Sequence, residues 1–180
     1  MKMKIIRNVF SSFFLIVAVI ITASAQTKKD KEIIEDSKEA KADFIEGDPE
    51  LAKHFSSAYG YSIYPNVGKG AIGIGGAAGN GTAYQGGKLI GMAKLSQLSF
   101  GFQLGGQEYR EVVFYKNKEA MDRFKKNKAE FSAQVSAVAI TAGVSADAAY
   151  VDGVMVFTMQ KGGLMYEAAV GGQKFKFDPF

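Results

Sequence analysis

The stretch Gly68-Lys69-Gly70-Ala71-Ile72-Gly73-Ile74-Gly75-Gly76-Ala77-Ala78-Gly79-Asn80-Gly81 decides the kind of fold to expect, because glycine occupies seven of its fourteen positions. It lies inside residues 51–107, which contain 14 of the chain's 21 glycines, four lysines and no Asp or Glu. Glycine lets a backbone approach another backbone or a ligand closely. A long segment that carries only positive charge attracts an anionic partner. The segment therefore predicts closely packed strands and a nearby site for an anion.

Alternation of large apolar residues with small or polar ones predicts β-strands on both sides of this stretch. The alternating segments are residues 59–63, 72–74, 100–104, 109–115, 135–142, 164–170 and 174–177, and the β-branched run at residues 154–159 predicts a further strand. Turns are expected between them at Pro65-Asn66, Gly79-Asn80-Gly81, Gly86-Gly87 and Gly105-Gly106. Asn-Gly and Gly-Gly pairs are strong signals of a tight hairpin.

Three helices are expected around these strands. Residues 28–45 mix lysine with acidic residues and predict a largely solvated helix that stops at Gly47. Asp48 is expected to cap a second short helix, and Asn117 a third over residues 118–131. The fold class is therefore α+β, a glycine-rich curved antiparallel sheet or partly closed β-barrel with N-terminal helices and one inserted helix.

Residues 1–25 have the features of a signal peptide. A positive start is followed by an apolar run over residues 9–21 and by Ala23-Ser24-Ala25, which fits a cleavage site before Gln26. We expect an exported protein that is periplasmic or secreted, with membrane association as an option. The expected organisation is a signal peptide over residues 1–25, a polar helical segment over 26–47 and one domain over 48–180.

Composition excludes several classes of function. Removing residues 1–25 takes three positive charges from a total of +4 and leaves +1, too little for a bulk nucleic-acid binder. The chain has no cysteine, and its single histidine, His54, has no acidic residue within residues 51–107 to help bind a metal. The G-x-G-x-x-G pattern at residues 68–73 is followed by strand-like sequence rather than a helix. We therefore expect no enzyme, no cofactor and no metal site.

The order of these motifs resembles the SYLF domain family, which comprises lipid-binding domains whose yeast members are actin-patch proteins. The matching residues are Asp48-Pro49-Glu50-Leu51, Ala58-Tyr59-Gly60, Tyr64-Pro65-Asn66-Val67-Gly68-Lys69-Gly70, Gly75-Gly76, Gly79, Gly81, Ser99-Phe100-Gly101-Phe102-Gln103-Leu104-Gly105 and Lys161-Gly162-Gly163-Leu164. Eukaryotic members are linked to phosphoinositides and actin. The resemblance implies a non-catalytic module of the cell envelope that binds anionic, phosphate-bearing lipid head groups.

Two basic sets are candidates for that binding. The first is Lys69, Lys88 and Lys94, together with backbone N–H groups at Gly68 and Gly70, because consecutive N–H donors form anion-binding concavities. Tyr64 and Tyr84 are expected at the boundary between apolar and polar regions. The second is a basic helix face, Arg123, Lys125, Lys126 and Lys128. The alternative is a structural or protein-interaction component of the periplasm or outer membrane, without a lipid ligand, whose glycines serve only sheet curvature.

Overall fold

The computed structural model describes residues 27–72, 74–99, 107–129, 137–161 and 172–180. Within these ranges it describes the backbone alone for residues 69–72, 74, 75, 98, 99 and 107. The predicted signal peptide, the predicted strands at 100–104 and 164–170 and the turn at Gly105-Gly106 lie outside the described residues. The chain divides into two units, residues 1–31 and 32–180, and the second unit contains the sheet.

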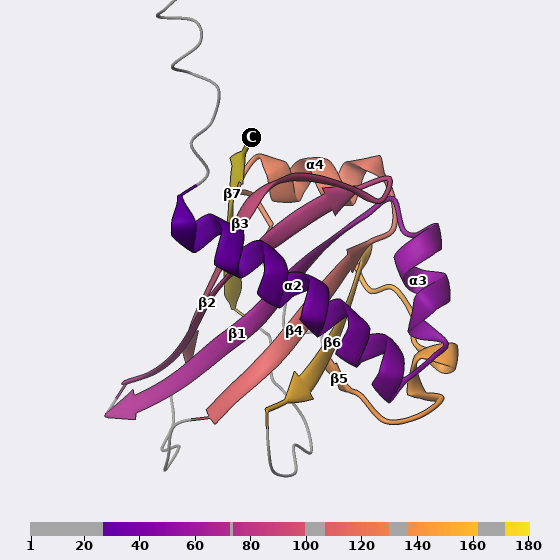
Figure 1. Cartoon of the computed structure of the whole chain (residues 1–180), viewed down its shortest axis with the longest axis horizontal. Helices are drawn as coiled ribbons and strands as arrows, with labels where there is room; N and C mark the ends of the chain where they lie inside the picture. Colours follow the sequence, from indigo (N-terminus) through magenta and orange to yellow (C-terminus); the bar gives the residue numbers. More distant parts are fainter. Residues whose placement is uncertain (1–26, 73, 100–106, 130–136, 162–171) are drawn as a thin grey trace, which may run out of the picture. The chain divides into compact units, whose positions relative to one another are not determined.

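The described elements form an α+β fold around one seven-stranded sheet (Figure 1). The helices are α2 (Lys28–Gly47), α3 (Leu51–Ser57) and α4 (Lys118–Lys125), with a 3-10 turn η1 (Val144–Asp147). The strands are β1 (Gly60–Ile72), β2 (Ile74–Gln85), β3 (Lys88–Ser99), β4 (Gln107–Tyr115), β5 (Ala137–Ala139), β6 (Val154–Gln160) and β7 (Gln173–Pro179). Their order is β5-β6-β4-β1-β2-β3-β7, antiparallel except for the β5–β6 pair. The α+β prediction is confirmed. The sheet formed by the described strands is open, with β5 and β7 at its edges, and does not form the partly closed β-barrel.

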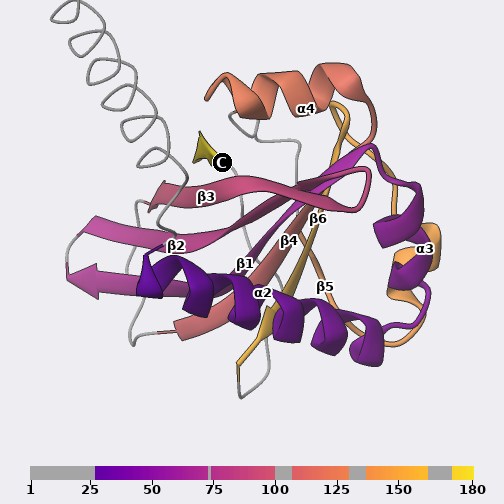
Figure 2. The same cartoon turned by 45° about the horizontal axis from the view of Figure 1, so that its top comes forward.

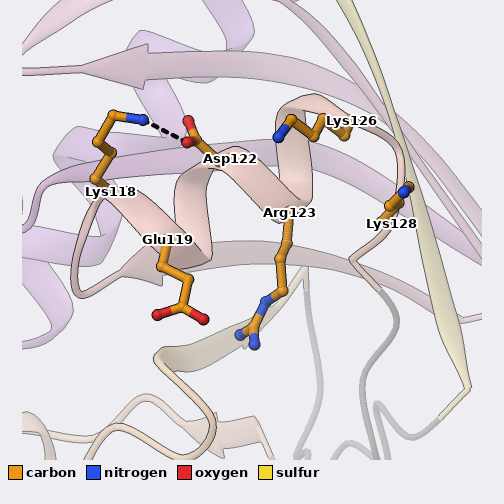
Figure 3. A pocket seen from close by; sticks show the side chains of 6 residues that line it. All are labelled: Lys118, Glu119, Asp122, Arg123, Lys126 and Lys128. Carbon is orange, nitrogen blue, oxygen red and sulfur yellow. Dashed lines mark hydrogen bonds and ion pairs between the residues drawn. The ribbon is translucent and has the colours of Figure 1, made fainter.

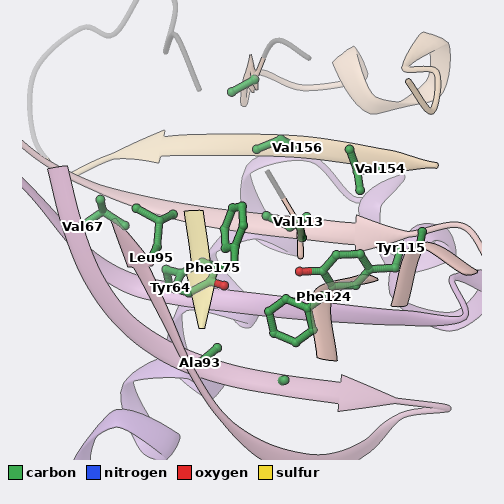
Figure 4. Packing of buried hydrophobic residues seen from close by; sticks show 14 of the residues in the cluster. Tyr64, Val67, Ala93, Leu95, Val113, Tyr115, Phe124, Val154, Val156 and Phe175 are labelled. Carbon is green, nitrogen blue, oxygen red and sulfur yellow. The ribbon is translucent and has the colours of Figure 1, made fainter. Parts of the chain in front are cut away.

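Each face of the sheet carries its own apolar core. On one face, Phe44 of α2 and Phe55 of α3 pack with Phe114 and Phe157. On the other, Phe124 of α4 packs with strand residues that include Tyr64 and Phe175 (Figure 4). Figure 2 shows α2 and α4 on opposite sides of the strands. This division leaves α4 and the end of the sheet beside it accessible from the side that α2 does not cover.

Helix α2 buries only one of its faces. Its buried residues are Ile34, Ser37, Ala40 and Phe44, which recur every three or four positions as expected for one face of a helix. Arg110 of β4 forms an ion pair with Glu39 at 3.0 Å and a closer one with Asp43. The prediction of a largely solvated helix holds for its outer faces, whereas the buried stripe joins it to the sheet.

Strands β1 and β2 run through two predicted turns. Asn80-Gly81 lies inside β2, and Pro65-Asn66 lies inside β1 at a register shift between Ile63 and Asn66. Proline donates no hydrogen bond, and in a sheet it is confined to edges and bulges. A Cβ atom at Gly81 would lie 2.0 Å from the carbonyl oxygen of Ile63. Gly81 is therefore required where β2 passes close to the β1 bulge. The predicted turns at Pro65-Asn66 and Gly79-Asn80-Gly81 are wrong, because both segments lie inside strands.

Gly86-Gly87 forms the expected hairpin turn between β2 and β3. Their φ angles are +56° and +76°, and Gln85 pairs with Lys88 across the turn. Two consecutive left-handed residues are characteristic of a type I′ turn, which glycine adopts without steric cost. The hairpin prediction is confirmed at this position.

Helix α4 begins as predicted and ends earlier than predicted. Asn117 accepts a hydrogen bond from the backbone N–H of Ala120 at 3.0 Å, as an N-cap residue does. The helix ends at Lys125 because Asn127 adopts a left-handed φ of 57°. The Asn127 side chain then accepts a hydrogen bond from Phe177 N at 2.7 Å, which joins this end of α4 to the edge strand β7.

A buried carboxylate fixes the corner between α2 and α3. Asp48 is fully buried and accepts hydrogen bonds from the backbone N–H groups of Ser145 at 2.8 Å and Glu50 at 3.1 Å. Burial acts to raise the pKa of this carboxyl, but hydrogen bonds from Ser145, Glu50 and Gly143 outweigh it and hold the pKa below its ordinary value. The prediction that Asp48 caps the second helix is wrong, because α3 begins at Leu51 and its N-cap residue is Glu50. Asp48 instead accepts a hydrogen bond in the turn before α3 and binds η1, which is distant in sequence.

We expect Asp48→Asn to lower the free energy of unfolding by about 2 kcal/mol at pH 7, because charge-assisted hydrogen bonds are lost. The folded-state pKa of Asp48 is lowered, so its stabilisation is present above the unfolded pKa of about 4 and is lost as pH falls through the folded value. Urea unfolding at pH 7 and pH 3 measures the difference. Asp147→Asn, an exposed carboxylate in η1, is the control and should change stability by less than about 0.5 kcal/mol. An equal loss for Asp48→Asn at both pH values would contradict the ionised role.

Candidate functional site

The structure does not bring Lys69, Lys88 and Lys94 together. Lys69 pairs with Ala77 of β2, and Lys88 pairs with Gln85 of β2. Ala77 and Gln85 are eight residues apart on that strand, so Lys69 and Lys88 are separated along the strand direction by roughly 27 Å at 3.4 Å per residue. Six residues of β3 separate Lys88 from Lys94, roughly 20 Å by the same rise. One head-group phosphate therefore cannot contact all three.

Lys94 has a carboxylate partner that its sequence neighbourhood does not show. Its Nζ lies 3.7 Å from Asp178 of β7, and Lys176 lies 3.5 Å from the other carboxylate oxygen. The β3–β7 pairing places Lys94 opposite Lys176. Although residues 51–107 contain no Asp or Glu, the fold places the carboxylate of Asp178 beside Lys94. Lys94 therefore belongs to a mixed-charge surface.

The remaining residues of the first set belong to the sheet and its cores. Tyr64 is fully buried in the core on the α4 side, so it is a core residue and not a boundary residue. Tyr84 is half-buried and stacks on Tyr61 with ring centroids 4.8 Å apart, in the core on the α2 side. Gly68 pairs with residues of both β2 and β4, so the sheet occupies its backbone groups. Gly70 likewise lies within β1.

A shallow basic hollow lies on the outer surface of α4 and the residues that follow it (Figure 3). Its lining residues are Lys118, Glu119, Asp122, Arg123, Lys126 and Lys128. Two of the four cations have carboxylate partners: Lys118 lies 2.5 Å from Asp122, and Arg123 lies 3.1 Å from Asp152. The hydrogen bond from Lys118 lowers the pKa of Asp122 and raises that of Lys118, so this pair stays ionised near neutral pH. Lys126 and Lys128 are exposed beside them.

A second hollow lies where the β2–β3 hairpin meets the start of β1. We call it the hairpin hollow; its lining residues are Ala58, Tyr59, Gln85, Gly86, Lys88 and Ile90. Lys125, on the flank of α4, donates a hydrogen bond to Gln85 Oε1, and Gln85 Nε2 donates one to the Tyr59 hydroxyl at 3.2 Å. The described lining contains no carboxylate. Lys88 of the first predicted set therefore lines this hollow, and Lys125 of the second is hydrogen-bonded to Gln85 in its lining.

His54 occupies a packing position. Its Nε2 lies 3.0 Å from the carbonyl oxygen of Ser145, and its ring lies 5.8 Å from that of Phe114. Among the residues that the structure describes, no three His, Cys, Asp or Glu side chains are grouped closely enough to hold a metal ion. The described helices also include none that is both long and apolar enough to cross a membrane.

A comparison with protein-family models matches residues 96–179 to Ysc84, a family described as Las17-binding protein actin regulator. Over these residues the chain is similar to the Ysc84/SYLF family. The SYLF resemblance drawn from the sequence is therefore confirmed over this segment. A search of curated proteins gave no match. The SYLF family is associated with lipid binding and is generally a non-catalytic binding domain.

The SYLF match covers one predicted basic set and not the other. Residues 96–179 include α4 with Arg123, Lys125, Lys126 and Lys128. The lysines of the glycine-rich part, Lys69, Lys88 and Lys94, precede the matched segment. Sequence reasoning missed that Lys125 reaches Gln85, 40 residues earlier in the chain. Nothing in the local pattern of either residue indicates that contact.

Proposed function

We propose that this chain is an exported, non-catalytic module that binds anionic, phosphate-bearing lipid head groups of the cell envelope. The binding surface is the end of the sheet where α4 meets the β2–β3 hairpin. One observation carries the proposal: Lys88 lines a hollow whose described lining has no carboxylate, and Lys125, from a separate element, donates a hydrogen bond to Gln85 in that lining. Lys126 and Lys128 extend the positive charge along the end of α4. The lipid association of the SYLF family supports the same proposal.

Export and envelope location rest on the sequence of the first 25 residues. The basic start, the apolar run and the small residues before Gln26 match what signal peptidases recognise. N-terminal sequencing of the protein from an envelope fraction should give a chain starting at Gln26. An intact Met1 in that fraction would contradict this part of the proposal.

The alternative of an envelope protein without a lipid ligand has one observation in its favour. A Cβ at Gly79 would meet Val67 at 2.9 Å, and Gly81 is packed still more closely, so these glycines serve strand packing. The glycine-rich stretch therefore needs no ligand to account for it. The lipid proposal depends on the cations at the α4 end and not on the glycines.

Binding of the purified protein to vesicles tests the function. Each lysine near an anionic surface contributes about 1 kcal/mol, so phosphatidylglycerol vesicles should bind more than about tenfold tighter than phosphatidylcholine vesicles. Raising the salt from 0.1 M to 1 M shortens the Debye length from about 10 Å to about 3 Å and should release the protein. Equal binding to both lipids, or none to phosphatidylglycerol at low salt, would favour the structural alternative.

A further inference from the structure

We propose that the hairpin hollow is a binding site for one phosphate group, with Lys88, Lys125 and the Tyr59 hydroxyl as its ligands. This inference rests on the proposed function for the source of the phosphate, a lipid head group. It goes beyond that function because a surface can attract anionic membranes without any stoichiometric site. The hollow is open to solvent and has a volume of about 600 Å³, which leaves room for a head-group phosphate.

A chain of hydrogen bonds holds the polar side chains of the hollow. Gln85 accepts from Lys125 through Oε1 and donates from Nε2 to the Tyr59 hydroxyl at 3.2 Å. The backbone N–H of Gly86 donates to the carbonyl oxygen of Tyr59 at 3.2 Å, which joins the hairpin to the start of β1. Because the Tyr59 oxygen accepts from Gln85, its own O–H is directed elsewhere and can donate to a ligand. Such pre-positioned donors reduce the cost of ordering a site on binding.

The charges around the hollow favour an anion. Helices α3 and α4 end nearby, at Ser57 and Lys125, and each helix C-terminus carries roughly half a negative charge. Lys88 and Lys125 contribute two full positive charges, so the local balance remains positive. The nearest acidic residue of α4 on this flank, Asp122, is already paired with Lys118. A phosphate group, with two or three acceptor oxygens, matches two ammonium groups and a hydroxyl.

An apolar rim distinguishes a lipid phosphate from a free one. Ala58 and Ile90 line the hollow. Phe180, a residue that is 51% exposed, donates a hydrogen bond from its backbone N–H to the carbonyl oxygen of Ile90 at 3.2 Å. Exposed aromatic side chains beside cations are typical of surfaces that contact the boundary between head groups and acyl chains. The glycerol and first methylenes of a lipid would lie against this rim. The favoured ligand is therefore a phosphate esterified to a lipid.

Calorimetric titration with water-soluble ligands tests the site apart from membrane adhesion. We expect saturable 1:1 binding of dihexanoyl phosphatidic acid below its micellar concentration. Glycerol 3-phosphate, which has the phosphate without the acyl chains, should bind at least about tenfold more weakly because it gains nothing from the apolar rim. Equal affinity for the two ligands would keep the phosphate site and overturn its assignment to a lipid.

Substitutions then locate the binding. Lys88→Gln should weaken phosphatidic acid binding at least about tenfold, since a charge-assisted hydrogen bond is lost. Lys94→Gln, which removes one lysine from the same strand outside the hollow, should change it less than about twofold. Both lysines are exposed, and circular dichroism checks that both variants fold. Absence of saturable binding, or equal effects of the two substitutions, would overturn the site.

The two proposals can fail separately. A protein that binds phosphatidylglycerol vesicles but no monomeric phosphatidic acid has the membrane function without the phosphate site. A protein that binds monomeric phosphatidic acid but not the vesicles has the phosphate site without the membrane function. Loss of both activities would contradict both proposals.

Discussion

Replacing Gly81 with alanine is expected to lower the free energy of unfolding by at least about 3 kcal/mol, a loss at the severe end for a single substitution. The new Cβ would lie 2.0 Å from the carbonyl oxygen of Ile63 and 2.8 Å from the ring of Tyr64. The carbonyl belongs to backbone at the β1 bulge, so relief requires moving two paired strands. Urea or thermal unfolding measures the loss.

Gly68→Ala is the matched control in the adjoining strand. A Cβ at Gly68 meets nothing within 4 Å, and the position is exposed. Alanine restricts the unfolded chain more than glycine does, so stability should be unchanged or rise by up to about 1 kcal/mol. If Gly81→Ala were as mild as Gly68→Ala, the close packing of β1 on β2 would be contradicted. The glycine-rich stretch would then again need a binding explanation.

Neutralising the cations at the end of α4 is the second large effect that we expect. Replacing Lys125, Lys126 and Lys128 with glutamine should weaken binding to phosphatidylglycerol vesicles by roughly a hundredfold, at about 1 kcal/mol per lysine near a charged surface. Folding should survive because Lys126 and Lys128 are exposed and Lys125 is only partly buried. Co-sedimentation at 0.1 M salt measures the affinity.

The control removes the same charge elsewhere. Replacing Lys53, Lys69 and Lys94 with glutamine lowers the net charge by three as well, but these lysines lie on α3, β1 and β3. This variant should bind less than about tenfold more weakly, since only long-range attraction changes. Equal losses in the two variants would mean that net charge alone drives binding. A larger loss in the control would return the site to the glycine-rich part of the chain.

Local signals predicted the elements that local chemistry controls. The Gly86-Gly87 turn, the Asn117 cap and the strands at β6 and β7 follow from residues within a few positions of one another. The helix end was placed too far along because an Asn in the left-handed region leaves little trace in sequence. These features concern turns, caps and periodicity, where neighbouring residues suffice.

Long-range pairing decided what the sequence could not show. Asn80-Gly81 reads as a hairpin, but β2 continues through it because Gly81 fits against the β1 bulge. Lys94 appears free of acidic neighbours until β7 places Asp178 beside it. The pairing of Lys125 with Gln85 spans 40 residues. The fold class could be predicted, whereas the grouping of cations into a candidate site required the register of the whole sheet.

The central claim, that the α4 and hairpin end of the sheet contacts anionic lipid, is tested most directly by tryptophan fluorescence, because the chain contains no Trp. Phe180→Trp places a probe beside Ile90, and Ile45→Trp places one on α2, across the sheet from α4. On phosphatidylglycerol vesicles that contain brominated lipid, the fluorescence emission of the Trp at position 180 should shift to shorter wavelength and be quenched. The emission of the Trp at position 45 should neither shift nor be quenched. Quenching at position 45 without quenching at position 180, or at neither position while the protein is bound, would contradict the claim.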